Sequence, residues 1–236
     1  MFTTLRVYHQ SLDSSLTNWA GHCDRILESL QTFGWQQPEW QRLRQGAQVL
    51  MAHFPVLRIT VFPDGREWIV GRLIPHSLTE SQHNGIAASV VAAPQFQRWF
   101  PAHKTGNYLS GWLARAKAQN MLAGEAILVD ETGNWLETST GNIWGWRDGN
   151  WWTPPRSAGI LPGVVRSELI NWLKREHQSV REEPWLPETV NSFEAIAYTN
   201  SVVEVIPIHT VIQPTSQMSY DPYHPGFKQL RSRFLT

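Results

Sequence analysis

The first part of the chain alternates between strand-like and helix-like hydrophobic patterns. Apolar residues occupy every second position in the strand-like segments and every third or fourth position in the helix-like ones. A Pro-Asp-Gly sequence at 63–65 separates two of the strands and is typical of a tight turn. The predicted elements are a strand at 4–8, helices at 22–34 and 38–54, and strands at 56–62 and 66–74.

A polar stretch and a run of small apolar residues come next. We predict a loop at 75–85, where "PHSLTESQHNG" is polar, and a strand at 86–94, where "IAASVVAAP" consists of small residues. The segment that follows is irregular, and we expect it to connect two domains. The predicted organisation is a small N-terminal α+β domain at 1–95, a connection at 96–104 and a larger domain at 105–236.

The second domain is predicted to be rich in β-structure and to carry two helices. Both helices show apolar residues at helical spacing; the first ends in glycine and the second is entered through Pro162 and Gly163. The overall fold class is α+β, with a ligand expected in the cleft that two such domains usually form. The expected helices are at 106–124 and 161–177, and the expected strands lie within 125–139, 142–155 and 193–211.

Composition narrows the class of protein. Of 236 residues, 42% are hydrophobic and 17% charged, which is typical of a globular chain. Lys plus Arg and Asp plus Glu balance at 20 each, so no net charge favours nucleic acid or an anionic membrane. The single cysteine, Cys23, excludes an internal disulfide, and we expect a cytoplasmic protein. The nine histidines are scattered without metal-ligand spacing, and no metal site is predicted.

A lysine at a strand-to-helix corner is the first candidate for chemistry. Lys104 opens the sequence "KTGNY". It is either a solvated surface residue or an amine that forms an imine with a cofactor aldehyde. The second role needs a neutral amine, so its pKa must fall from about 10.4, and desolvation and nearby positive charge both act in that direction. The sequence alone leaves both interpretations open.

Other positions are consistent with a site for a phosphorylated cofactor. The amides of Val164 and Val165 open a predicted helix and would present N–H groups to an anion. The Ser201 hydroxyl and the Arg25 guanidinium could complete a phosphate site, and Glu137 could pair with a ring nitrogen. Taken singly, each of these residues is more often an ordinary surface or packing residue.

Five motifs, in this order, resemble the fold-type IV pyridoxal-phosphate enzymes. They are "HKTGNYL", "EAILVDETGNWLETSTGNIW", "TPP", "GILPGVVRSEL" and "TNSVVEVIPI"; "FTTLRVY" and "HCDRILESL" resemble the family's N-terminal half. The family includes branched-chain aminotransferases, D-amino-acid aminotransferases and 4-amino-4-deoxychorismate lyases. The resemblance implies two domains, a small α/β N-terminal one and a β-barrel-like C-terminal one with flanking helices.

The resemblance also implies a role for each matching residue. Lys104 would hold pyridoxal 5'-phosphate covalently and act as general base and acid, while Glu137 would pair with the ring nitrogen. Tyr108 would hydrogen-bond the phenolic oxygen of the cofactor, and Asn142 would support the Glu137 loop. The phosphate would be held by Arg25, Val164, Val165 and Ser201. A small-molecule substrate and a homodimer are implied as well.

Small differences in spacing favour the lyase among these enzymes. The asparagine of "KTGN" follows the lysine by three residues, whereas branched-chain aminotransferases usually place one more residue between them. "FTTLRV" and "KTGNYL" are also close to the lyase pattern. We therefore predict conversion of 4-amino-4-deoxychorismate to 4-aminobenzoate and pyruvate, a step in folate synthesis. A class IV aminotransferase acting with 2-oxoglutarate is the alternative.

Two features depart from the family pattern. The short segment that normally precedes "FTTLRV" and carries a first strand is not present in the sequence. The arginine that usually follows the strand of the first domain is replaced by "FPDGR". Arg66 and Arg72 are candidate ligands for a substrate carboxylate, and His76 and His103 are further candidates without an assigned role.

Overall fold

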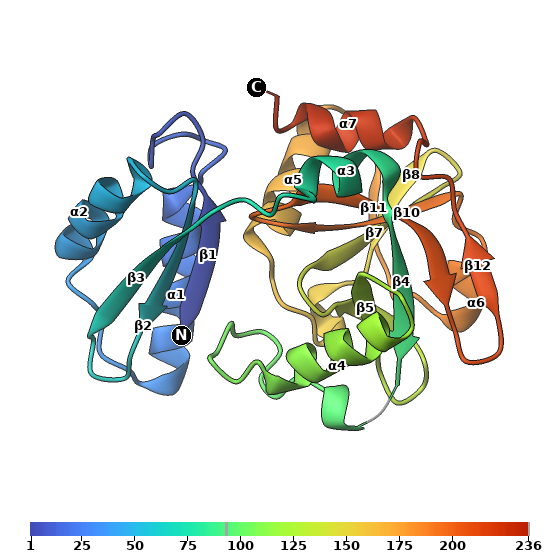
Figure 1. Ribbon diagram of the computed structural model, residues 1–236, viewed down its shortest axis with the longest axis horizontal. Coiled ribbons are helices and arrows are strands. Elements are labelled where there is room, and N and C mark those ends of the chain that lie inside the picture. Colours follow the sequence, from blue (N-terminus) through green and yellow to red (C-terminus); the bar gives the residue numbers. More distant parts are fainter. Residues whose placement is uncertain (93, 236) are drawn as a thin grey trace. The chain divides into compact units, whose positions relative to one another are not determined.

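The chain folds into two compact units. The structure, a computed structural model, describes residues 1–92 and 94–235 (Figure 1). Unit 1 consists of Met1–His76 and His103–Gly106, and unit 2 of Ser77–Ala102 and Asn107–Thr236. The short return of the chain to unit 1 is notable because it contains Lys104.

Unit 1 is a three-stranded antiparallel sheet packed against two helices. Its strands are β1 (Phe2–Arg6), β2 (Val56–Val61) and β3 (Glu67–Arg72), hydrogen-bonded in that order, and its helices are α1 (Trp19–Phe33) and α2 (Trp40–Met51). Burial of apolar side chains between sheet and helices holds the unit together. Its buried core contains Leu5, Ile26, Leu30, Leu43, Leu57 and Ile59.

Local signals explain where α1 begins and ends. The side chain of Asn18 accepts a hydrogen bond from the amide of Gly21 at the N-terminus, which satisfies one of the free N–H groups of the first turn. Gly34 ends the helix at φ 64°, a conformation that glycine adopts without steric cost. The helix therefore presents one fixed face, which carries His22, Arg25 and Ile26, to the unit's interior.

Unit 2 is built on one large mixed sheet. Within the described residues the sheet has nine strands in the order β6-β5-β4-β11-β10-β7-β8-β9, with β12 paired to β11. Pairing is parallel for β4 with β5 and with β11, and antiparallel for most other neighbours. The strands are β4 (Ile86–Val91), β5 (Glu125–Val129), β6 (Trp135–Thr138), β7 (Asn142–Arg147), β8 (Asn150–Thr153), β9 (Val180–Glu182), β10 (Ala195–Asn200), β11 (Glu204–Ile212) and β12 (Gln217–Ser219).

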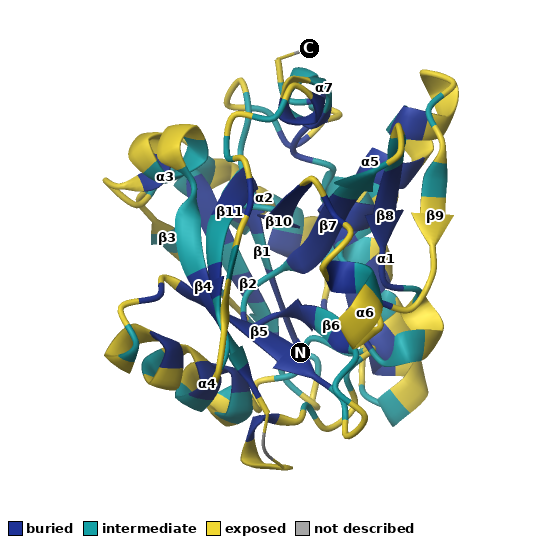
Figure 2. Cartoon of the chain, turned by 90° about the vertical axis from the view of Figure 1, so that its right-hand side faces the viewer, coloured by how far each residue is buried: buried dark blue, intermediate teal, exposed yellow. Residues whose placement is uncertain are grey.

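Helices flank this curled sheet. The core around α5 contains Trp144 and Trp151 from β7 and β8, and Figure 2 shows these strands as buried. These tryptophans therefore belong to the hydrophobic core of unit 2. The helices are α3 (Leu78–Asn84), α4 (Leu109–Asn120), α5 (Val164–Arg175), α6 (Pro187–Val190) and α7 (Gly226–Ser232), with short 3-10 turns at Pro94–Phe96 and Arg156–Ala158. No described helix has the length and apolar character needed to traverse a bilayer.

The sequence-based elements largely match this structure, with one correction. The stretch predicted as a loop at 75–85 contains helix α3. Its polar residues hid the helix, because only Leu78 is buried and Gln82 uses its amide to donate to the Val203 carbonyl at 3.0 Å. Of the strand predicted at 86–94, β4 is present; Ala93 and Thr236, which the predicted ranges included, lie outside the described residues.

The units and the predicted domains differ over one segment. Residues 77–95 were expected in the N-terminal domain, but α3 and β4 belong to unit 2. The reason is the parallel pairing of β4 with both β5 and β11, which places it inside the large sheet. Such long-range pairing has no local signature in the sequence.

Candidate active site

Lys104 is attached to the edge strand of unit 1. The backbone amide of Phe2 in β1 donates to the Lys104 carbonyl at 2.9 Å. The Lys104 ammonium lies 4.9 Å from the centroid of the Phe2 ring, a cation–π distance. The start of the chain thus fixes the position of the lysine backbone within this unit.

Arg25 and His22 share a buried polar cluster with Thr3 in the same unit. Arg25 Nη2 donates to Thr3 Oγ1 at 2.7 Å, and Thr3 Oγ1 lies 2.6 Å from His22 Nδ1. Burial lowers the pKa of His22 well below its ordinary value of 6.5, and the positive charges of Arg25 and Lys104 lower it further. A neutral imidazole therefore stands near the two cations.

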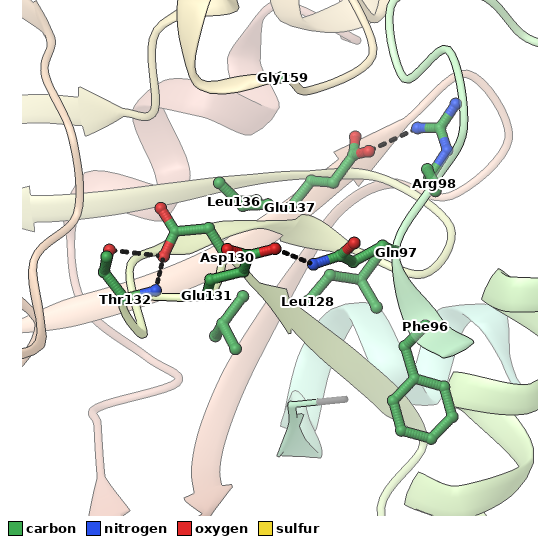
Figure 3. Close-up of a pocket in the computed structure, with 11 residues that line it drawn as sticks. Phe96, Gln97, Arg98, Leu128, Asp130, Glu131, Thr132, Leu136, Glu137 and Gly159 are labelled. Atoms are coloured by element: carbon green, nitrogen blue, oxygen red, sulfur yellow. Dashed lines mark hydrogen bonds and ion pairs between the residues drawn. The ribbon is translucent and has the colours of Figure 1, made fainter. Parts of the chain in front are cut away.

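Glu137 is the central carboxylate of unit 2. It lies in β6 with only 4% of its surface exposed. Its Oε2 accepts from the Leu161 amide at 3.1 Å and from Asn142 Nδ2 at 3.4 Å, and its Oε1 forms an ion pair with Arg98. Figure 3 shows the Glu137 and Arg98 side chains pointing toward each other. These donors hold the carboxylate in a fixed orientation.

Asn142 connects Glu137 to the start of α5. Its Nδ2 also donates to the Leu161 carbonyl at 2.9 Å. Gly163 passes so close that a Cβ added there would lie 2.1 Å from Asn142 Oδ1. Glycine is therefore required by a close approach at this turn. It is also the N-cap of α5 and provides no side-chain cap.

Val164 and Val165 form the first turn of α5. The first N–H groups of an α-helix have no partner within the helix, and the helix dipole adds partial positive charge there. Both side chains are buried, so the sequence presents backbone rather than side-chain atoms at this end. Such a terminus favours an anionic group.

Tyr108 and Ser201 adjoin the same part of unit 2. The Tyr108 hydroxyl donates to the Ser139 carbonyl at 3.4 Å, two residues after Glu137. Ser201 lies in the turn between β10 and β11, directly after Asn200, whose Nδ2 donates to the Thr140 carbonyl at 3.2 Å. Both residues are thus placed next to the 137–142 segment.

A cleft of about 440 Å³ borders Glu137 within unit 2. Figure 3 shows Glu137 and Arg98 among its lining residues, together with Asp130, Glu131 and Leu128. Asp130 is occupied by hydrogen bonds to the amides of Thr132 and Asn134, each at 2.9 Å, and these bonds shape the β5–β6 turn. Glu131 accepts a hydrogen bond from Gln97 Nε2 at 3.5 Å, so the acidic side chains that line this cleft have partners within unit 2.

The predicted cofactor ligands fall into two groups, one in each unit. Unit 1 gathers Arg25 and Lys104 around His22. Unit 2 contains the Glu137 carboxylate, the Asn142 side chain that donates to it and the first turn of α5. Tyr108 and Ser201, which carry hydroxyl groups, lie next to the same segment. The roles assigned to all eight residues remain predictions. The second group consists of Glu137, Asn142, Val164, Val165, Tyr108 and Ser201.

Sequence reasoning missed three residues of these clusters. Arg98 lies in an irregular segment where no periodicity indicates its contact with Glu137. Thr3 and His22 had a detectable signal, because His22 and Arg25 stand three residues apart and so share one face of a helix. For Thr3 the signal was the alternation along β1, which predicts the face of the sheet on which its side chain lies.

Two further candidates from the sequence, Arg66 and His103, take part in local contacts of unit 1. Arg66 pairs with Asp64 at 2.7 Å in the exposed β2–β3 turn. His103 Nδ1 lies 3.0 Å from Ser29 Oγ, and its ring packs on Phe33. Burial raises the pKa of the Cys23 thiol to about 12, which argues against a catalytic thiolate.

Comparison with known proteins defines the family. Residues 1–211 match the family model of amino-transferase class IV, and the chain belongs to this family. The family is pyridoxal-phosphate-dependent and contains both lyases and aminotransferases. The predicted resemblance to fold-type IV enzymes is therefore confirmed, as is the predicted cofactor.

Two relatives represent the two activities. A putative branched-chain-amino-acid aminotransferase of Methanocaldococcus jannaschii is 32% identical over 111 residues, 47% of this chain and 38% of that protein. The chain thus spans well under half the length of that relative. An aminodeoxychorismate lyase of Vibrio harveyi is 20% identical over 221 residues, 87% of this chain and 82% of that protein.

Solved structures show the same fold. The Escherichia coli branched-chain amino acid aminotransferase superposes with a TM-score of 0.82 at 21% identity, over 100% of this chain and 84% of that one. A hypothetical aminotransferase from Mycobacterium tuberculosis in its PLP-bound form gives a TM-score of 0.81 at 17% identity, over 98% and 87% of the two chains. The predicted two-domain fold-type IV class is confirmed.

The side chains present fit pyridoxal phosphate. In unit 1 the Arg25 guanidinium suits a phosphate and the Lys104 amine suits an aldehyde; in unit 2 the α5 terminus suits a phosphate and the buried Glu137 carboxylate suits a ring nitrogen. The close approach at Gly163, which a Cβ would obstruct, brings the α5 terminus up to the Asn142 and Glu137 side chains. The chemistry of the donor set therefore agrees with the family's cofactor.

Proposed function

We propose that the protein is a pyridoxal-phosphate-dependent 4-amino-4-deoxychorismate lyase. The observation that carries this proposal is the extent of its likeness to the Vibrio harveyi lyase, which continues through 87% of this chain. The three-residue step from Lys104 to Asn107 supports the same choice. The reaction would yield 4-aminobenzoate and pyruvate.

We assign the chemical roles as follows. When bound, the cofactor withdraws electrons from the carbon that carries the substrate amine. Lys104 removes the proton from that carbon as general base, and its protonated amine then returns a proton to the departing enolpyruvyl group. The group leaves as pyruvate and the substrate ring becomes aromatic, which supplies much of the driving force.

The remaining residues bind and orient. Glu137 holds the proton on the ring nitrogen, and Asn142 keeps its carboxylate in place through the 3.4 Å contact. Arg25, Ser201 and the amides of Val164 and Val165 bind the phosphate. Tyr108 is proposed to contact the phenolic oxygen, in exchange for its long 3.4 Å bond to the Ser139 carbonyl.

A class IV aminotransferase is the second candidate. The relative with 32% identity is a putative branched-chain-amino-acid aminotransferase, and this likeness over 111 residues favours it. Both activities begin with the same proton removal by Lys104. In the lyase, loss of this proton expels the enolpyruvyl group from the neighbouring ring carbon; in an aminotransferase, Lys104 would return the proton at the other end of the C–N bond, so that the amino group stays behind and an oxo acid leaves.

Parallel assays distinguish the two candidates. One supplies 4-amino-4-deoxychorismate and measures 4-aminobenzoate and pyruvate; the other supplies leucine or D-alanine with 2-oxoglutarate and measures glutamate. We expect turnover in the first. Turnover confined to the second would replace the lyase with an aminotransferase and leave the cofactor assignment unchanged.

We also propose that the enzyme is a cytoplasmic homodimer. The family analogy supports a dimer, and α4 exposes two large apolar side chains, Leu109 at 62% and Trp112 at 64%, that a second copy would cover. Light scattering at micromolar concentration is expected to give twice the monomer mass. A monomeric mass would contradict the proposal.

A further inference from the structure

The Thr3 hydroxyl is the centre of the polar cluster in unit 1. Its side chain is fully buried, and within the described residues it contacts two polar side chains. Arg25 Nη2 lies 2.7 Å from Thr3 Oγ1, and His22 Nδ1 lies 2.6 Å from the same oxygen. These short contacts join β1 to α1 at the residue proposed to bind phosphate.

The protons available set the direction of one hydrogen bond and favour a direction for the other. A guanidinium has donors and no acceptor, so Arg25 must donate to the Thr3 oxygen. The Thr3 oxygen has a second lone pair that could accept from His22 Nδ1, but the buried hydroxyl proton would then have no acceptor among the side chains that Thr3 contacts. Satisfying that proton favours an unprotonated His22 Nδ1, and the ring proton of a neutral imidazole then sits on Nε2.

The surroundings agree with this protonation state. His22 is 2% exposed, and burial is the largest effect that lowers its pKa, followed by the charges of Arg25 and Lys104. A protonated ring would leave the Thr3 proton without an acceptor and add a third positive charge to the cluster. The neutral state avoids both costs.

From this geometry we propose that Thr3 and His22 are positioning residues that aim the Arg25 guanidinium at the anionic group of the ligand. His22, as the Nε2–H tautomer, orients the Thr3 hydroxyl, and the Thr3 oxygen then fixes one arm of Arg25. The inference rests on the proposed phosphate role of Arg25. Neither residue touches the ligand in this arrangement.

A purely structural role for the cluster makes a different prediction. If Thr3 and His22 only stabilise unit 1, their loss lowers the unfolding temperature and weakens every ligand equally. If they position Arg25, their loss weakens the binding of the phosphate specifically. The ratio of the dissociation constants for pyridoxal and pyridoxal 5'-phosphate isolates that contribution, because the two ligands differ only in the phosphate.

The experiment compares Thr3→Val with Thr3→Ser in the full chain. Valine matches threonine in shape and removes the hydroxyl, whereas serine retains it. We expect Thr3→Val to reduce the affinity ratio about tenfold, the size of one hydrogen bond to a charged group, and Thr3→Ser to keep it within about twofold of the original. Thr4→Val removes a hydroxyl from the neighbouring strand position and is the matched control. Unfolding temperatures establish that all three variants are folded.

A second measurement tests the tautomer without any substitution. The ¹⁵N chemical shifts of the His22 imidazole, assigned by comparison with His22→Gln, are expected to show a neutral ring protonated at Nε2 near neutral pH. A ring protonated at Nδ1, or at both nitrogens, would overturn the proposal. So would an unchanged affinity ratio in a folded Thr3→Val protein.

Arg25→Gln separates failure of this inference from failure of the proposed function. If Arg25→Gln lowers the affinity ratio while Thr3→Val does not, Arg25 binds phosphate without help from Thr3, and only the positioning role is wrong. If Arg25→Gln itself leaves the ratio unchanged, the phosphate role of Arg25 is wrong and the inference falls with it. Neither outcome depends on whether the enzyme is a lyase or an aminotransferase.

Discussion

The two units bury polar groups of opposite kinds. Unit 1 buries a base, His22, beside the cations Arg25 and Lys104. Unit 2 buries an acid, Glu125, which accepts hydrogen bonds from the hydroxyls of Ser139 and Thr140 and from the Ala126 amide. Burial lowers the pKa of His22 and raises the pKa of Glu125, so each group is driven toward its neutral form.

The difference shows a common way of tolerating buried ionisable groups. In both units a hydroxyl on a strand or its following turn satisfies the buried group, which would otherwise be costly to desolvate. In unit 2 the hydroxyls belong to the 137–142 segment that also carries Glu137 and Asn142. In unit 1 the hydroxyl belongs to the strand that hydrogen-bonds the Lys104 backbone. Buried polar groups thus stabilise the segments that carry the proposed functional residues.

The largest effect is expected when the Lys104 amine of unit 1 is removed. Lys104→Ala is expected to lower turnover by at least about 10³-fold, because the proposed general base is lost, and to abolish the visible absorbance of bound cofactor. Product formation and absorbance spectra measure the two effects. Lys117→Ala, which alters a lysine of α4, is the control and is expected to remain active. An active, coloured Lys104→Ala protein would contradict the proposed role.

The second largest effect is expected when the Glu137 carboxylate of unit 2 is replaced by a neutral amide. Glu137→Gln is expected to keep most of the bound cofactor and to lower turnover roughly 100-fold, because a neutral amide stabilises the ring proton less well. Equilibrium dialysis and steady-state kinetics provide the comparison. Glu131→Gln, which alters another carboxylate that lines the cleft, should behave like the unchanged protein. Full activity in Glu137→Gln would remove this residue from the chemistry.

A third effect concerns stability rather than turnover. Arg98→Gln leaves the buried Glu137 carboxylate without its cation and is expected to lower the free energy of unfolding by roughly 3 kcal/mol. Denaturant titration measures this loss. In Arg98→Gln/Glu137→Gln double mutants part of the stability should return, because no buried charge remains. The loss is expected to exceed that in Arg147→Gln, whose partner Asp148 is 83% exposed; equal losses would contradict the buried pair.

The smallest expected effects are changes in how stability depends on pH. Because the pKa of native His22 lies well below 6.5, the unfolded chain binds the proton first as the pH falls. The contribution of neutral His22 is therefore complete above pH 6.5 and is lost as the pH falls toward the lowered pKa. In His22→Gln, thermal unfolding below pH 6.5 should show a shallower decline. An identical decline would indicate that His22 titrates normally.

For Glu125 we expect stability to depend on pH in the opposite direction, with the loss occurring as the pH rises. Its native pKa is raised above 4.5, mainly by burial, so the native state holds the proton more tightly than the unfolded chain. That contribution is complete below pH 4.5 and is lost as the pH rises through the raised pKa. Glu125→Gln should therefore gain stability relative to the unchanged protein as the pH rises. A constant difference between the two proteins would argue against a protonated Glu125.

Much of the fold followed from local patterns, and the exceptions share a cause. Alternation and helical spacing located β1, α1, α4 and α5, and glycine and proline marked their ends. Helix α3 was missed because its residues are polar and its stability depends on contacts such as that of Gln82 with the Val203 carbonyl. The place of β4 inside the large sheet was missed because it depends on parallel partners distant in the chain.

In the candidate site, too, some features followed from local sequence signals and others depended on long-range contacts. The order and spacing of the motifs identified the cofactor, and they predict a residue for each of its chemical groups, because a reaction of this kind restricts residue type at each position. Contacts with residues outside the motifs were not predictable, since an ion pair such as that of Arg98 with Glu137 depends on two distant segments of the chain meeting in the fold.

The sequence by itself determined the family, the cofactor and the local elements, because these depend on residue types and on short-range periodicity. The tertiary structure alone decided that Arg98 pairs with Glu137, that Thr3 bridges His22 to Arg25, and that α3 and β4 join unit 2. Those outcomes depend on which side chains become buried together. Burial is a property of the whole fold, and it alone sets how strongly a charge needs its partner.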